Sequence, residues 1–163
     1  MKRRSSVELS ALALSFAVAT STASCSAPIA PVPRHDQVVE TWIFSSSESD
    51  QLRESDPSSA VVDLRPDGTA TVKDYPNPGF PDSVIFGEGR STTGRWDIVP
   101  QLDKYSGAQG RPGIHLSLIN PASPTNTRTG VVLVVVGDEK DIRIMTKLSD
   151  GSDVGIRYVL RRD

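Results

Sequence analysis

From residue 38 onward, short apolar or alternating segments are separated by turn-forming residues, and this pattern limits the fold more than any other feature. Residues 113–119 alternate, so that Ile114, Leu116 and Leu118 share one face, as in a half-buried strand. Residues 130–136 are a continuous apolar run rich in β-branched side chains, which is typical of a strand covered on both faces. Helical periodicity is almost absent from this part of the chain. The pattern therefore predicts an all-β domain.

The spacing of the turns predicts how the strands are connected. Pro66-Asp67-Gly68 is a hairpin signal, because proline fixes φ and Asp-Gly tolerates the positive φ that follows. The last three predicted strands are joined by very short connections, which favours a meander, and closure into a barrel removes exposed sheet edges. We therefore expect a closed antiparallel meander barrel of about eight strands, with a small β-sandwich as the alternative. The predicted strands are residues 39–44, 60–65, 69–74, 93–99, 113–119, 130–136, 141–148 and 155–162.

The N-terminal segment has the features of an export signal. Basic residues 2–4 precede an apolar stretch over residues 9–19, which is too short to span a bilayer as a helix. Small residues follow and end at Cys25, the one cysteine of the chain. This arrangement resembles a bacterial lipoprotein signal peptide, with Thr22 at the position where leucine is usual. An ordinary signal peptide cut after Ala23, with Cys25 as a free thiol, is the alternative.

The resemblance to lipoproteins implies a domain organisation and a location. Residues 1–24 are the signal peptide, residues 25–37 are the lipidated cysteine and a proline-rich spacer, and residues 38–163 are the β domain. Several prolines favour extended polyproline geometry in the spacer. Lipid on Cys25 would anchor the domain to a membrane of the cell envelope, at the outer face of the plasma membrane in a single-membrane bacterium.

Charge and motifs argue against two classes of function. Without residues 1–24, which hold three basic residues and one acidic residue, the formal charge falls from −2 to about −4. Nucleic-acid binding needs a basic face, so we expect none. The chain has no GxSxG, HExxH, paired-cysteine or phosphate-loop motif, and His35 and His115 alone do not make a metal site. We therefore expect no enzymatic activity, no catalytic residue, no cofactor and no metal.

Four structural motifs of the domain carry a resemblance. They are Trp42 in the first strand, the hairpin at residues 64–69, Thr93-Gly94-Arg95-Trp96, and the closing segment 153–160. Together they look like small lipocalin-like lipoproteins of actinobacterial type, most of them uncharacterised. The resemblance covers nearly the whole mature domain and implies the barrel fold, with no catalytic residue to transfer. The chain departs from that family in two longer loops, at residues 45–59 and 75–91.

The second of these loops supplies the candidate binding residues. Residues 75–86 hold more apolar side chains than a solvent-facing loop usually does, among them Tyr75, Phe80, Ile85 and Phe86. One interpretation is that the loop folds back as a lid or an extra strand. The other is that it forms the lip of a barrel mouth and contacts a ligand or partner. Two functions follow, a barrel that binds a small apolar ligand, or a filled barrel that binds another envelope protein.

Overall fold

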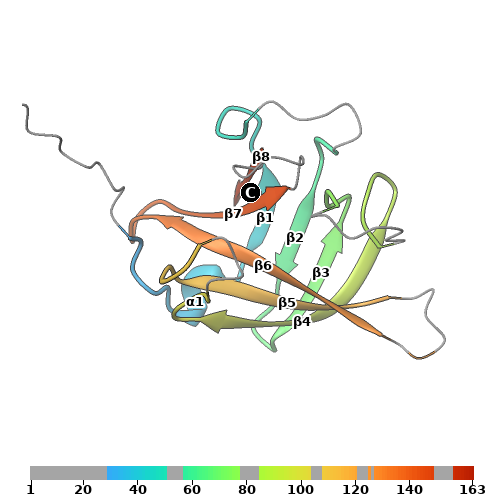
Figure 1. Ribbon diagram of the computed structural model, residues 1–163, viewed down its shortest axis with the longest axis horizontal. Coiled ribbons are helices and arrows are strands. Elements are labelled where there is room, and N and C mark those ends of the chain that lie inside the picture. Colours follow the sequence, from blue (N-terminus) through green and yellow to red (C-terminus); the bar gives the residue numbers. More distant parts are fainter. Residues whose placement is uncertain are drawn as a thin grey trace, which may run out of the picture.

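A computed structural model describes residues 29–50, 57–77, 85–103, 108–120, 125, 127–148 and 156–163 (Figure 1). In this part of the chain eight antiparallel strands follow one another in sequence order, and β1 pairs with β8 to close a barrel. The predicted all-β meander barrel is confirmed, and the sandwich alternative is wrong. The strands are β1 (Thr41–Phe44), β2 (Val61–Leu64), β3 (Thr69–Lys73), β4 (Ser91–Val99), β5 (Gly113–Ile119), β6 (Arg128–Gly137), β7 (Ile142–Leu148) and β8 (Ile156–Arg162).

In β5 and β6 the buried side chains are the ones that the sequence pattern predicts. In β5 the side chains of Ile114, Leu116 and Leu118 are buried, and the residues between them are partly exposed. In β6 the apolar run has buried side chains on both faces, because Val134 points away from the core and is also buried. The cover comes from the loop after β4, where Leu102 packs against Gly113 of the neighbouring strand.

The tight turn between β2 and β3 forms at the predicted Pro-Asp-Gly sequence. Arg65 donates its backbone N–H to Thr69 O at 3.0 Å, and Gly68 adopts a φ of +78°, which favours glycine. Asp67 Oδ1 accepts the backbone N–H of Thr69 at 2.9 Å. The side chain of an aspartate at this position therefore completes the turn, as in an Asx-turn.

The barrel interior is one packed core of large side chains. Phe44 and Ile98 pack against it from partly buried positions. The inward-facing aliphatic and aromatic side chains form a single cluster with little exposure to solvent. Its members include Trp42, Val62, Leu64, Val72, Tyr75, Ile85, Phe86, Trp96, Leu116, Leu133, Ile144, Tyr158 and Leu160. These side chains occupy the space in which a wider barrel holds a ligand.

A single helical turn, α1 (His35–Val38), lies across one end of the barrel (Figure 1). Trp42 Nε1 donates to Val38 O at 3.1 Å, and the ring of His35 stacks on Trp96 with ring centres 4.8 Å apart. The end of the predicted spacer therefore packs onto the domain, where the sequence indicated only an extended linker. No helix in the described residues is long and apolar enough to cross a bilayer.

Candidate functional site

Three of the four predicted lip residues lie inside the barrel end opposite α1. Tyr75, Ile85 and Phe86 are buried in the core cluster, and Phe80 lies outside the described residues. The backbone N–H of Gly87 donates to Tyr75 O at 2.8 Å, which brings the two ends of this loop together. These three side chains therefore form no exposed patch, and a partner on the outer surface would not contact them. Their role in ligand contact stays a prediction.

Tyr75 has one unusual property for a core residue. Its side chain is 1% exposed, and its hydroxyl has no hydrogen-bond partner of normal geometry, although Thr146 is a polar neighbour. Burial raises the pKa of this phenol above its ordinary value. Tyr158 lies beside it, with ring centres 6.2 Å apart, and donates its own hydroxyl to Pro57 O at 2.7 Å. Among the described residues, the Tyr75 hydroxyl is therefore a buried donor without a partner of normal geometry, whereas buried polar groups usually have one.

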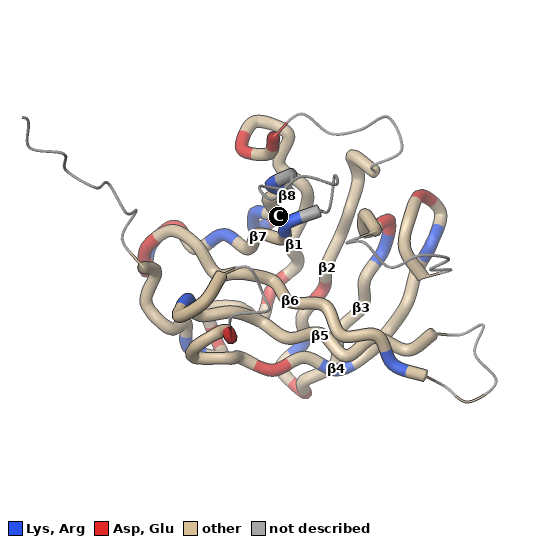
Figure 2. Tube along the Cα trace, in the orientation of Figure 1, with Lys and Arg blue, Asp and Glu red and all other residues tan. Residues whose placement is uncertain are grey.

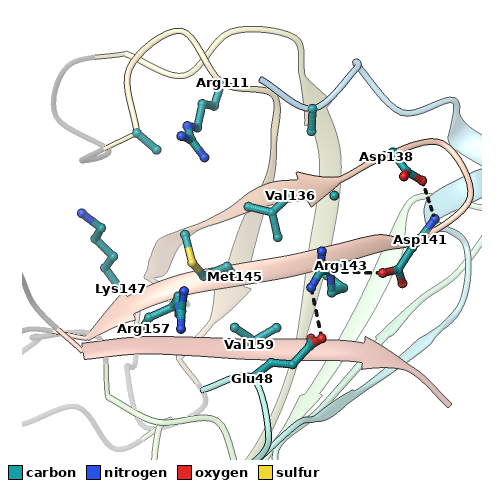
Figure 3. Close-up of a pocket in the computed structure, with 13 residues that line it drawn as sticks. Glu48, Arg111, Val136, Asp138, Asp141, Arg143, Met145, Lys147, Arg157 and Val159 are labelled. Atoms are coloured by element: carbon teal, nitrogen blue, oxygen red, sulfur yellow. Dashed lines mark hydrogen bonds and ion pairs between the residues drawn. The ribbon is translucent and has the colours of Figure 1, made fainter. Parts of the chain in front are cut away.

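A second site, which the sequence did not predict, lies on the outside of the barrel. We call it the outer groove (Figure 3). Its floor is the outer face of β6, β7 and β8, and its volume is about 680 Å³. Its walls come from the segment before α1, the turn after β1, and the loop between β4 and β5. Its lining residues are Ala30, Glu48, Ala108, Arg111, Val136, Gly137, Asp138, Asp141, Arg143, Met145, Lys147, Arg157 and Val159.

Strand alternation builds the floor of the outer groove. Because every second side chain of a strand points outward, β7 presents Arg143, Met145 and Lys147 while Ile142 and Ile144 face the core. The two strands β7 and β8 carry five basic residues and no acidic residue. Figure 2 shows these basic positions close together where β7 and β8 lie side by side. In a domain with an excess of acidic residues, this is a local concentration of positive charge.

One end of the outer groove is neutralised by carboxylates. Arg143 pairs with Glu48 at 3.0 Å and with Asp141 at 3.6 Å, and Arg161 pairs with the same two carboxylates. Asp138 accepts the backbone N–H groups of Lys140 and Asp141, which lowers the pKa of its carboxyl and keeps it ionised at neutral pH. This acidic end therefore has no surplus of positive charge.

The other end of the outer groove is cationic. Arg111, Lys147 and Arg157 lie on the side of the groove away from Asp138 and Asp141, Arg111 on the loop and the other two on the strands (Figure 3). Arg157 pairs with a carboxylate at 3.4 Å, whereas the side chains of Arg111 and Lys147 make no ion pair within the described part of the chain. Apolar side chains of Val136, Met145 and Val159 form the floor between the two ends. An anionic group attached to a short apolar segment would match this arrangement.

The described residues contain no group of three or more histidine, cysteine, aspartate or glutamate side chains that could hold a metal ion. His115 lies on the outer face of β5, where its Nδ1 is 3.4 Å from Asp97, and His35 stacks on Trp96. Cys25 lies outside the described residues. The outer groove, with basic side chains beside an apolar floor, is the candidate site.

Part of the outer groove could be predicted from the sequence. The alternation of β7 and β8 already placed Arg143, Arg157 and Arg161 on the outer face. It did not show that Glu48, 95 residues before Arg143, would pair with it, or that the loop holding Arg111 would form a wall.

Comparison of the chain with protein-family models, with curated proteins and with solved structures gave no significant match.

Proposed function

We propose that this chain is an exported, lipid-anchored domain of the cell envelope that binds an anionic, partly apolar molecule in the outer groove. The location is inferred from the basic N-terminus, the apolar segment 9–19 and Cys25. The barrel acts as a rigid scaffold, and the binding residues are on its outer surface. No step of covalent chemistry is included in this proposal.

The main support for this proposal is that basic side chains without an ion pair lie beside the apolar floor of the outer groove. Arg111 and Lys147 face the groove without an ion pair in the described chain, next to Met145 and Val159. Cationic side chains bind phosphate and carboxylate through charge-assisted hydrogen bonds. The buried core cluster lies in the barrel interior, whereas the outer groove has a volume of about 680 Å³.

An NMR titration tests this proposal. The ¹⁵N-labelled chain from Ser26 to Asp163 is titrated with n-octyl phosphate, and with n-octanol as the uncharged control. We expect shifts of the amides of Met145, Lys147 and Val159 with the phosphate, and much smaller ones with the alcohol, because the phosphate is the group that the cations bind. Shifts confined to interior positions such as Val72, or none at all, would contradict the proposal.

A second candidate function is a ligand inside the barrel, and the unpaired hydroxyl of Tyr75 favours it. A small molecule with a polar acceptor would satisfy this donor. Native mass spectrometry of the chain purified gently from its own host detects a bound molecule, and the double variant Arg111→Gln with Lys147→Gln assigns it to one of the two sites. A reproducible adduct of a few hundred daltons that survives this substitution would establish the interior ligand, and an adduct that is lost would belong to the outer groove.

The variant Tyr75→Phe makes the same distinction by stability. In a filled barrel the substitution removes an unpaired hydroxyl, so we expect the free energy of unfolding to stay unchanged or to rise by about 1 kcal/mol. Chemical denaturation measures this value, with Tyr158→Phe as the matched control because Tyr158 donates to Pro57 O and should lose about 1 kcal/mol. A clear loss of stability for Tyr75→Phe, together with loss of an adduct, would support the interior site.

A further inference from the structure

The segment before α1 exposes apolar side chains beside the outer groove. Ile29 is 63% exposed and Val32 is 50% exposed, and they are the large hydrophobic residues most open to solvent in the described chain. Ile29 directly precedes Ala30, and Val32 follows it by two residues; Ala30 is buried and lines the groove. Single exposed aliphatic residues are common, but two in the segment that forms one wall of a groove with basic side chains make a mixed surface of apolar and basic groups. Such a surface fits the interface of an anionic bilayer.

The same segment leads directly to the anchor. Cys25 precedes Ala30 by five residues, and a five-residue segment spans at most about 18 Å when fully extended. This step rests on the proposed function, because it takes Cys25 as the lipidated residue. A lipid on Cys25 would then hold the rim of the groove within a short distance of the bilayer surface. The nearest abundant anionic, partly apolar molecules are the phospholipids of that bilayer.

We infer that the segment 29–34 and the outer groove together form a membrane-contacting face, and that the groove holds the headgroup phosphate of an anionic phospholipid. Arg111 and Lys147 contact the phosphate, and Met145 and Val159 contact the carbon atoms next to it. Ile29 and Val32 insert their side chains at the interface. The barrel is thereby held against the membrane in one orientation, in addition to being tethered to it.

The inference is tested with vesicles and with protein that has no lipid of its own. All strand pairs that close the barrel lie within residues 41–162, so a chain from Ser26 to Asp163 keeps them. Flotation measures its binding to phosphatidylcholine vesicles with and without 30% phosphatidylglycerol. We expect binding to the anionic vesicles only, and weaker binding when NaCl is raised from 0.1 to 0.5 M, because salt screens exposed charges.

Paired substitutions locate the contact. Each basic residue near an anionic surface contributes about a fivefold increase in affinity, so the double variant Arg111→Gln with Lys147→Gln should bind the anionic vesicles about 30-fold more weakly. The matched control is Arg90→Gln with Arg128→Gln, which removes the same charge from exposed positions outside the groove and should bind within about threefold of the parent. Ile29→Ser with Val32→Ser should also weaken binding.

The outcomes separate this inference from the proposed function. Equal losses in the groove variant and the control variant would mean attraction by net charge alone and would overturn the inference. A second outcome is that the chain does not bind vesicles although n-octyl phosphate still shifts the groove amides. This outcome would also overturn the inference, but the proposed function would stand, with a soluble anion or an acidic protein segment as the bound group. Failure of both probes would overturn the proposed function as well.

Discussion

Replacement of Trp42 by alanine is expected to lower the free energy of unfolding by about 3–5 kcal/mol. The side chain is fully buried in the core cluster, and its Nε1 donates to Val38 O at 3.1 Å. Its ring also lies 5.6 Å from the guanidinium of Arg162, the last residue of β8. One side chain therefore joins the closing strand pair β1–β8 to the helical turn that covers the barrel end. Its removal leaves a cavity and also an unpaired backbone carbonyl.

Urea denaturation followed by tyrosine fluorescence and circular dichroism measures this loss. Small domains have a total stability of about 5–15 kcal/mol, so this loss is a large fraction of the total and should clearly lower the urea midpoint. Trp42→Phe retains most of the apolar volume but removes the N–H donor, and it should lose about half as much. Val32→Ala, at an exposed position, should change the stability by less than about 0.5 kcal/mol. A loss of less than 1 kcal/mol for Trp42→Ala would contradict the role assigned to this side chain.

The strands could be predicted because their signals are local. In β5 the predicted and observed bounds are the same, since alternation and flanking turns mark both ends. For β4 the prediction began at Thr93, whereas the strand begins at Ser91, where Lys73 of β3 pairs with it. Nothing in residues 91 and 92 themselves signals that pairing. Strand ends depend on the partner strand, and a sequence shows the partner only indirectly.

The candidate site was harder to predict, because the contacts that build it are distant in the chain. The sequence left open whether the loop that holds Tyr75 and Phe86 folds back onto the barrel or forms an exposed lip, and the structure buries both rings in the core cluster. The apolar content of that loop was interpreted correctly as unusual, but it does not show on which side of the sheet the side chains pack. The outer groove combines Glu48, Arg111 and strand β7 from three separate parts of the chain. Only the folded barrel brings these together.

Replacement of Gly94 by alanine is expected to destabilise the barrel by about 3 kcal/mol. Gly94 lies within β4, paired with Leu118 of β5. A Cβ atom at this position would lie 2.2 Å from Ser117 O and 2.9 Å from Leu118 Cα, and both of these are backbone atoms. A flexible side chain can move aside, but a strand can yield only if its hydrogen bonds to the neighbouring strand are stretched. The methyl group would therefore push β4 and β5 apart.

Gly130→Ala is the matched control, because it adds the same atom within a strand of the same sheet. There a Cβ would lie 3.1 Å from His115 Nε2, the end of a half-exposed side chain that can rotate away. Since alanine is also less flexible than glycine in the unfolded chain, this variant should stay within about 1 kcal/mol of the parent. Thermal and urea unfolding of the two variants compare them directly. If Gly94→Ala and Gly130→Ala had similar free energies of unfolding, β4 and β5 would be able to move apart at Gly94 without a loss of stability. That result would contradict the predicted effect of Gly94→Ala.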